Sequence, residues 1–269
     1  MTELTAAALV QRGITQLTGR SDSPGRDAEV LLQAACGIDR TTLAKNPDQP
    51  VDAAATDLER ELSSLHCLIN NAGVMVPPYS KTKDGFELQI GTNHLGHFAL
   101  TGRLMGLLLA TPESRVVSVS SNAHKMGKIR FDDLHYEKRY SRWGAYCQSK
   151  VANLLFCYEL QRRLSATGAS CRSVAAHPGW THTNLFAQSW TARVTGSYIA
   201  MDADAGAAPT LRAATEPEAE GGSYYGPGGF LEIWGSAVRV QSNRYSQRED
   251  VAARLWAVSQ DLTSVRFMS

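Results

Sequence analysis

Short apolar runs alternate with long helical segments from Leu65 onward, and this alternation limits the fold more than any other feature. The runs are LHCLIN, SRVVSVSS and SCRSVAAHPG, and the segments between them are DGFELQIGTNHLGHFALTGRLMGLLLA and GAYCQSKVANLLFCYELQRRLS. Strand, long helix and strand in succession are typical of right-handed βαβ units. The sequence therefore predicts an α/β fold built on a parallel sheet.

The first 64 residues have a different pattern of apolar residues. LTAAALVQRGITQL, AEVLLQAACG and VDAAATDLERELSSL have apolar residues at helical spacing, and Ser23-Pro24 suits the start of a helix. No β-rich run occurs before residue 65. We therefore expect a helical N-terminal module over residues 1–64 and an α/β domain over residues 65–269, with no strand from residues 4–64 in the main sheet.

Composition narrows the class of protein. Of the 269 residues, 43% are hydrophobic and 20% are charged, which is enough for a packed core. The net charge of +1 shows no excess of basic residues, so nucleic acid is not expected as a partner. The five cysteines form no CxxC pair, which favours free thiols over a disulfide frame or a zinc site. We expect a cytoplasmic protein without a metal.

Two features of the chain argue against the membrane and the secretory route. The N-terminal MTELTAAALVQRG lacks the basic start of a signal peptide. The longest apolar stretch, FALTGRLMGLLLA, contains Arg103 and is too short for a spanning helix. We therefore expect no membrane span.

Four polar residues follow the predicted strands and suggest proton transfer during hydride chemistry. Tyr146 and Lys150 are four apart, so they share one face of a helix. A nearby ammonium and a cationic nicotinamide ring would lower the tyrosine pKa from about 10. Tyr146 would then exchange a proton with an alcohol or carbonyl, while Ser121 stabilises the substrate oxygen. Asn93 would open its helix to a water that links the lysine to solvent.

LINNAG, TNHLGHF, VVSVSS, YCQSK and HPGWTHT occur in this order along residues 65–269. Together they resemble the motifs of the short-chain dehydrogenase/reductases, and GVMVPPYSKTKDGFELQIGTNHLGHFALT looks most like the branch of the retinol dehydrogenases and the WW-domain oxidoreductase. The resemblance implies a Rossmann-like domain that transfers hydride between NAD or NADP and a small hydrophobic alcohol or carbonyl compound. The branch favours NADP.

The resemblance also implies roles for particular residues. It assigns a catalytic tetrad and a set of residues that face the cofactor, and the usual PGxVxT motif reads PGWTHT here, with Thr181 in place of valine. The tetrad is Asn93, Ser121, Tyr146 and Lys150; the cofactor-binding set is Asn71, Ala72, Gly73, Tyr146, Lys150, Gly179 and Thr183.

The TGxxxGxG loop that opens this family's fold is absent. The nearest string, LTGRSDSPGRD, has Ser23 at a glycine position and follows no β-rich strand. Residues 5–64 instead resemble the helical N-terminal domain of the release-factor glutamine methyltransferases, through SPGRDAEVLLQAACGIDRTTLAKNPDQPV. The resemblance implies a dehydrogenase that lacks its first half, and the domain that carries methyl transfer in the second family is absent too.

The alternative to an active oxidoreductase is a non-catalytic remnant or binding module that keeps the tetrad without holding the dinucleotide. On that interpretation free NAD(P) binds weakly, and LHCLIN exposes an unpaired edge that favours self-association.

Two further patterns have ordinary interpretations. His94 and His97 are three apart, but no third ligand is evident, so packing is favoured over a metal. The glycine-rich GGSYYGPGGF, residues 221–230, lacks the strand and helix of a phosphate loop and is interpreted as a turn at the sheet edge.

Overall fold

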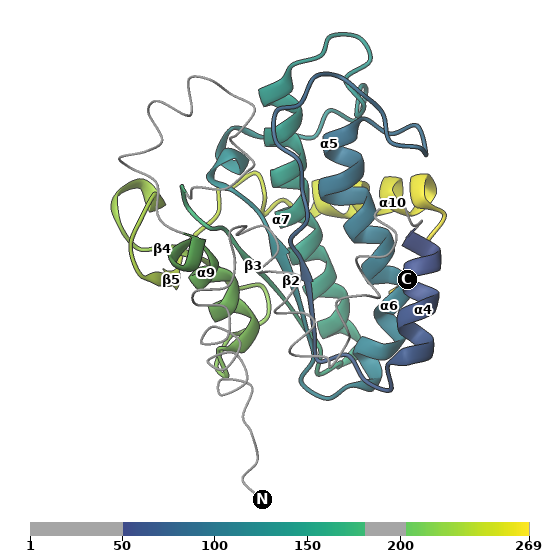
Figure 1. Ribbon diagram of the computed structural model, residues 1–269, viewed down its shortest axis with the longest axis vertical. Coiled ribbons are helices and arrows are strands. Elements are labelled where there is room, and N and C mark those ends of the chain that lie inside the picture. Colours follow the sequence, from purple (N-terminus) through teal and green to yellow (C-terminus); the bar gives the residue numbers. More distant parts are fainter. Residues whose placement is uncertain (1–50, 181–202, 269) are drawn as a thin grey trace, which may run out of the picture.

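A five-stranded sheet runs through the centre of the computed structural model, which describes residues 51–180 and 203–268 (Figure 1). The strands lie in chain order, β1 to β4 are parallel, and β5 pairs antiparallel with β4. This confirms the predicted α/β fold with a parallel, Rossmann-like sheet. The strands are β1 Cys67–Asn70, β2 Arg115–Val119, β3 Arg172–Ala176, β4 Tyr224–Pro227 and β5 Ala237–Arg239.

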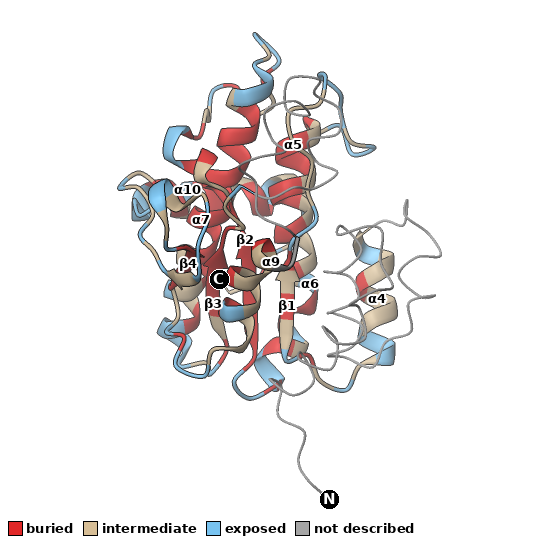
Figure 2. Ribbon diagram, turned by 60° about the vertical axis from the view of Figure 1, so that its left-hand side comes forward, coloured by how far each residue is buried: buried red, intermediate tan, exposed pale blue. Residues whose placement is uncertain are grey.

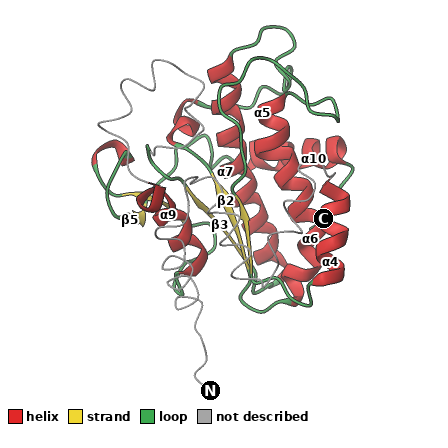
Figure 3. Cartoon of the chain, viewed as in Figure 1, coloured by secondary structure: helices red, strands yellow, loops and turns green. Residues whose placement is uncertain are grey.

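Long helices connect the strands, as the alternation predicted (Figure 3). Among the helices described over residues 51–180 and 203–268, none has the length and apolar character needed to cross a membrane. The α-helices are α4 Val51–Glu61, α5 Leu88–Ile90, α6 Gly96–Ala110, α7 Arg142–Thr167, α9 Ala203–Thr215 and α10 Glu249–Thr263; the π-helix is η2 Gly91–Leu95, and the 3₁₀ helices are η3 Asn122–Met126 and η6 Phe230–Glu232.

Consecutive residues of β2 pack on opposite faces of the sheet, because side chains alternate along a strand. Val116 belongs to a core with residues of α6, α7 and α10, whereas Val117 packs with Ala213 of α9 on the other face. All five residues of β2 are buried, as the interior strand of a parallel sheet requires (Figure 2).

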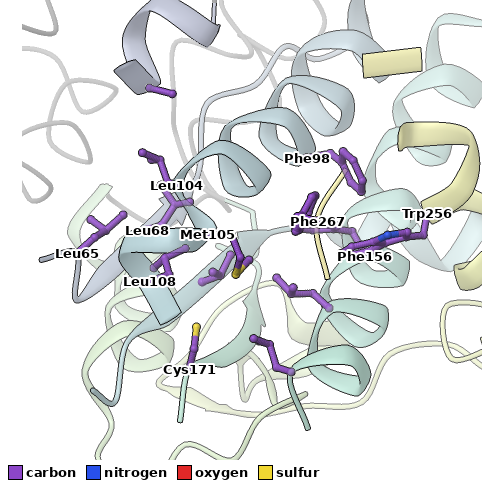
Figure 4. Packing of buried hydrophobic residues seen from close by; sticks show 14 residues of the cluster. Leu65, Leu68, Phe98, Leu104, Met105, Leu108, Phe156, Cys171, Trp256 and Phe267 are labelled. Carbon is purple, nitrogen blue, oxygen red and sulfur yellow. The ribbon is translucent and has the colours of Figure 1, made fainter. Parts of the chain in front are cut away.

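An aromatic cluster closes the space between α6, α7, α10 and the C-terminal segment (Figure 4). Phe98 lies at its centre, with ring centroids 5.0 Å from Trp256, 4.9 Å from Phe267 and 5.7 Å from Phe156. The Phe98–Trp256 and Phe98–Phe156 pairs meet edge to face, an arrangement in which the positive ring edge meets the negative ring face. This cluster fixes α7, which carries Lys150, against α6, which continues the π-helical turn that contains Asn93.

Helix α4 confirms the helix that was predicted from VDAAATDLERELSSL. It packs along α6, with Ala55 fully buried and Leu58 partly buried in the core shared with α6. Asp52 also pairs with Arg103 of α6 at 3.5 Å. The rest of the expected helical module lies outside the described residues, so the division at residue 64 remains a prediction.

The interpretation of GGSYYGPGGF as an edge turn was wrong for its central residues. Tyr224–Pro227 form β4, which lies between β3 and β5, and both tyrosines are buried. The glycines suggested a turn, but Gly226 lies inside the strand, where only a glycine fits. A β-carbon there would lie 2.0 Å from His177 Nε2. Only the turn that precedes the strand, at Gly221 and Gly222, matches the expectation.

Candidate functional site

The carboxyl ends of three neighbouring parallel strands meet at one edge of the sheet, where α/β folds place their ligands. β1 is followed by Asn71 and Ala72, both exposed, and β2 is followed by Ser120 and Ser121. Gly179 lies three residues beyond the end of β3. The residues that follow β1, β2 and β3 therefore lie along the same edge of the sheet.

Asn93 lies in the π-helical turn η2, which interrupts an otherwise continuous helical run from Leu88 to Ala110. Its amide Nδ2 donates to Val74 O and Ser149 Oγ, both at 2.9 Å, and its Oδ1 accepts from Val74 N at 2.8 Å. The side chain is fully buried. Asn93 therefore ties the loop after β1 to helix α7, and the opened helix that was expected at this residue is present.

Lys150 is buried under the same loop. Its ammonium donates to Val119 O at 3.2 Å, and its Nζ lies 5.7 Å from the centre of the Tyr146 ring. Burial alone lowers the pKa of Lys150 to about 8. The lysine is thus held next to the tyrosine with a proton that it can release near neutral pH.

Tyr146 and Ser121 are brought together by α7 and the end of β2. A hydrogen bond from the Ser121 side chain lowers the pKa of Tyr146, but burial outweighs it and raises the value to about 12. In the protein alone, desolvation of the phenolate is the larger effect, and the lowering expected from Lys150 together with a nicotinamide ring stays a prediction. The phenol is protonated at neutral pH.

The loop after β1 fits a ligand that approaches Lys150 closely. A β-carbon on Gly73 would lie 2.9 Å from Asn93 Oδ1 and 3.8 Å from Lys150 Nζ, so a side chain there would fill the space above the lysine. Asn70 Oδ1 is buried and has no hydrogen-bond partner among the residues that the structure describes. These features suit the nicotinamide ribose of a dinucleotide, which would need hydrogen-bonding groups at this rim.

Gly179 and Thr183 were both predicted to lie near the nicotinamide amide. Gly179 has φ of +71°, a conformation that glycine adopts without strain, and its N–H donates to His177 Nδ1 at 3.2 Å. Thr183 lies outside the described residues.

Sequence reasoning missed three polar side chains that hold the tetrad in place. Ser149 passes the hydrogen bond from Asn93 to Tyr146 O at 2.8 Å. Asn153 donates to the same Val119 carbonyl as Lys150, at 3.0 Å. Ser120 Oγ donates to Lys150 O at 2.8 Å. The available signal was helical spacing, because Ser149 and Asn153 lie three and seven residues after Tyr146.

The two histidines of TNHLGHF have different surroundings. His94 Nε2 is 2.9 Å from Ser259 Oγ, and its ring contacts Phe98 and Phe156. His97 is nearly as buried, with 9% exposure, but its Nδ1 has no hydrogen-bond partner among the described residues. Packing accounts for His94 and leaves the function of His97 open.

Comparisons with known proteins agree with this geometry. A family model described as short chain dehydrogenase matches residues 3–193. Human Retinol dehydrogenase 12 is 43% identical over 225 residues, covering 81% of this chain and 67% of that protein. Mouse Retinol dehydrogenase 11 is 39% identical over 267 residues, covering 96% of this chain and 81% of that protein.

A crystal structure of a protein from Mycobacterium Paratuberculosis is 45% identical, with a TM-score of 0.67, and the match covers 80% of this chain and 73% of the other. The family match begins at residue 3, so it includes the segment that resembles a methyltransferase head; that second resemblance remains a prediction. By sequence and by fold, this chain belongs to the short chain dehydrogenase family.

Proposed function

We propose that the chain is an NADP-dependent oxidoreductase that interconverts a hydrophobic alcohol and its carbonyl compound. The observation that carries the proposal is the meeting of Tyr146 with Ser121 beside the buried Lys150. A phenol, a hydroxyl and an ammonium in this arrangement supply the acid and the hydrogen-bond donors that a reacting carbonyl oxygen needs.

Each side chain has a separate task. Tyr146 is the proton donor when a carbonyl is reduced, since its raised pKa keeps the phenol protonated at neutral pH. Ser121 donates a hydrogen bond to the substrate oxygen as negative charge develops on it. Lys150 places a positive charge beside the phenol, which favours the phenolate that is left after proton transfer.

The surroundings of Tyr146 favour an apolar substrate. Met75 and Val76 pack against the cluster that contains Tyr146, and Trp143 lies one helical turn before it, with ring centroids 5.6 Å apart. Trp143 remains 47% exposed although it is a large aromatic residue. An apolar substrate would bury these surfaces, so the proposal names a hydrophobic alcohol or carbonyl compound, of which retinoids are one class.

A bound nicotinamide dinucleotide would supply or accept the hydride. Asn71, Ala72, Gly73 and Gly179 would hold its nicotinamide half, with Lys150 at the ribose hydroxyls and Thr183 at the amide. NADP is chosen over NAD because the motif-bearing residues resemble the retinol-dehydrogenase branch. The site needs no metal.

The second candidate is a non-catalytic remnant, favoured by one observation: the sequence contains no TGxxxGxG. If residues 1–64 are a separate helical module, the chain lacks the glycine loop and helix N-terminus that bind the pyrophosphate. Losing two or three charge-assisted hydrogen bonds, each worth about 1.5–3 kcal/mol, would weaken binding roughly a thousandfold or more. Self-association through β1 belongs to this second candidate, whereas a cytoplasmic location is proposed for both.

Two measurements test these candidates. Calorimetric titration of the purified protein with NADPH measures binding, and NADPH consumption with a long-chain aldehyde measures turnover. For an active enzyme, Tyr146→Phe lowers kcat by about 100- to 10,000-fold, while NADPH binding stays within a few-fold.

The matched control is Tyr158→Phe, in the same helix. The Tyr158 hydroxyl donates to Ser242 Oγ at 2.8 Å, and the variant keeps full turnover. Absence of saturable NADPH binding by the folded wild type rejects the enzyme and supports the remnant. Equal turnover by the two tyrosine variants rejects the role of Tyr146.

A further inference from the structure

The loop between β4 and β5 holds two consecutive non-glycine residues in the left-handed region of backbone conformation. Leu231 has φ of +51° and Glu232 has φ of +57°. Such strain persists only where the surroundings fix the backbone. Asn122 supplies fixing contacts, because its amide Nδ2 donates to Leu231 O and to Glu232 O, each at 3.1 Å. Since Asn122 directly follows Ser121, the strained turn is held next to the segment that carries the proposed catalytic serine.

The Glu232 carboxylate joins this turn to two other loops at the site. Its Oε1 accepts from Lys125 Nζ at 3.1 Å, and its Oε2 lies 3.1 Å from His177 Nε2. Lys125 belongs to η3, and His177 is the first residue after β3. The hydrogen bond from His177 is the largest of the effects that lower the pKa of Glu232 to about 2, so the carboxylate is charged at neutral pH. One side chain thus connects the loops that follow β2, β3 and β4.

The contacts of His177 determine which of its ring nitrogens carries the proton. The residue is fully buried, and its Nδ1 accepts the Gly179 N–H at 3.2 Å. A ring nitrogen that accepts a hydrogen bond is unprotonated, so Nε2 carries the proton and donates to the Glu232 carboxylate. Gly179 itself has φ of +71°. The protonation state of the His177 ring therefore couples Glu232 to the turn at Gly179.

Strand β4 and the loop after it enclose the same ring. The His177 ring centroid lies 5.2 Å from that of Tyr224, and a β-carbon on Gly226 would lie 2.0 Å from His177 Nε2. The backbone adds a further connection, because Trp180 N donates to Ile233 O at 3.0 Å. The ring is therefore packed directly on β4, which favours one orientation of its two nitrogens.

We propose that Glu232 is a positioning residue that acts through His177: by accepting the Nε2 proton it fixes the turn at Gly179. The inference rests on the proposed function, in which this turn holds the nicotinamide half of the dinucleotide. No proton is transferred, because the histidine keeps its Nε2 proton throughout. The loop between β4 and β5 therefore belongs to the site, although it supplies no member of the tetrad.

Two substitutions at this position separate its two contacts. Glu232→Leu removes both acceptor oxygens at nearly constant size, so the buried Nε2–H loses its partner. Glu232→Gln keeps one acceptor, since the amide oxygen can face His177 while Lys125, whose side chain is 41% exposed, turns to water. The matched control is Glu220→Leu, in which the lost carboxylate is 70% exposed and pairs with Arg239 at 2.8 Å.

The first experiment needs neither cofactor nor substrate. NMR of protein carrying nitrogen-labelled histidine identifies the protonated nitrogen of His177 and measures how fast its proton exchanges with water. We expect the proton on Nε2 in the wild type, with exchange about tenfold faster in Glu232→Leu but within twofold in Glu232→Gln and Glu220→Leu. A proton on Nδ1 in the wild type, or exchange in Glu232→Leu within twofold of the wild type, overturns the proposal.

The second experiment measures NADPH oxidation with dodecanal, per folded molecule. We expect Glu232→Leu to lower kcat about tenfold, the size of effect that a small displacement of reacting groups produces, with the KM for dodecanal within twofold of the wild type. Glu232→Gln should restore kcat to within about threefold of the wild type, and Glu220→Leu should leave it unchanged.

A kcat of Glu232→Leu within twofold of the wild type, or a fall in kcat without faster proton exchange at His177, also overturns the proposal. Faster exchange in Glu232→Leu together with an inactive wild type would reject the proposed function and retain the role of Glu232 in fixing the turn, so the two failures are distinguishable.

Discussion

The two sides of the helical run from Leu88 to Ala110 differ in character: one is aromatic and the other is polar. On one side His94 and Phe98 face an apolar, aromatic cluster in which rings fill the space between helices (Figure 4). On the other side Asn93 bonds to Val74 of the loop after β1 and to Ser149, the residue before the buried Lys150. One motif, TNHLGHF, thus supplies both the packing that fixes the site and the polar groups within it.

The contrast between the two sides shows that the residues that stabilise the fold differ from the residues that form the candidate site. Within the described part of the chain, the aromatic side leaves one buried polar atom without a hydrogen-bond partner, Trp256 Nε1. Among the described residues, the polar side keeps buried atoms without a hydrogen-bond partner on Asn70 and His97. Substitutions on the first side should therefore change unfolding free energy, and substitutions on the second should change turnover.

The largest effect is expected on the aromatic side. Phe98→Ala removes a fully buried ring that contacts three other aromatic rings. We expect the free energy of unfolding to fall by about 3–5 kcal/mol, the cost of a large cavity in a packed core. Urea unfolding measures it. Phe230→Ala, at a ring that is 68% exposed, is the control and should change stability by less than about 0.5 kcal/mol.

The next effect depends on pH. Burial lowers the pKa of His94 to about 3, well below the ordinary 6.5, so the unfolded chain binds this proton more readily than the folded one. Its contribution to stability is complete above pH 6.5 and is lost as the pH falls towards 3. At about 1.4 kcal/mol per pH unit, the loss between pH 6.5 and pH 4 approaches roughly 3 kcal/mol.

His94→Gln isolates this effect. We expect the variant to show a flatter dependence of unfolding free energy on pH between 6.5 and 4, with the remaining slope due to His97 and His124, whose pKa values burial also lowers to about 4. Thermal unfolding at a series of pH values measures the slopes. Parallel curves for variant and wild type would show that His94 is not the buried titrating group.

The sequence predicted the sheet and the helices well because both follow from local patterns. The alternation of LHCLIN, SRVVSVSS and SCRSVAAHPG with helical segments was enough to place β1, β2 and β3. The π-helical turn at Gly91–Leu95 has a different origin, since Asn93 bonds to Val74 and Ser149 on other elements. A local opening of the helix at Asn93 was expected, but its π-helical form depends on these contacts between elements.

Tertiary packing decided two features that the local sequence pattern does not show. GGSYYGPGGF reads as a turn, yet packing against His177 and neighbouring strands makes Tyr224–Pro227 a strand. The lowered pKa expected for Tyr146 counted the charges of Lys150 and a nicotinamide ring but not the burial of the phenol, which raises it in the protein alone. Helical spacing of three residues also could not separate His94 from His97, because their different surroundings come from α10 and the loop after β1.

On the polar side, Gly73→Ala tests the space above Lys150. The new β-carbon would lie 2.9 Å from Asn93 Oδ1, so the amide or the loop must shift by a few tenths of an ångström. We expect kcat to fall about 10- to 100-fold, the size of effect that small displacements of reacting groups produce. The unfolding free energy should change by only about 1 kcal/mol. A loss of stability without a loss of turnover would remove the distinction between the two sides.

The smallest effect separates two glycines of α6 that differ only in which direction they face. Gly106 has open space where a β-carbon would go, whereas a β-carbon on Gly102 would lie 2.5 Å from Phe267 Cδ1. Because alanine favours a helix over glycine, Gly106→Ala should raise the unfolding free energy by about 0.5–1 kcal/mol. Gly102→Ala should lower it, since the helix preference is outweighed by the displaced ring of the aromatic cluster. Urea unfolding of both variants under one condition measures the contrast. Equal changes in unfolding free energy for the two variants would mean that the aromatic cluster can accommodate an added methyl group. The aromatic side would then not be a rigid support for the site.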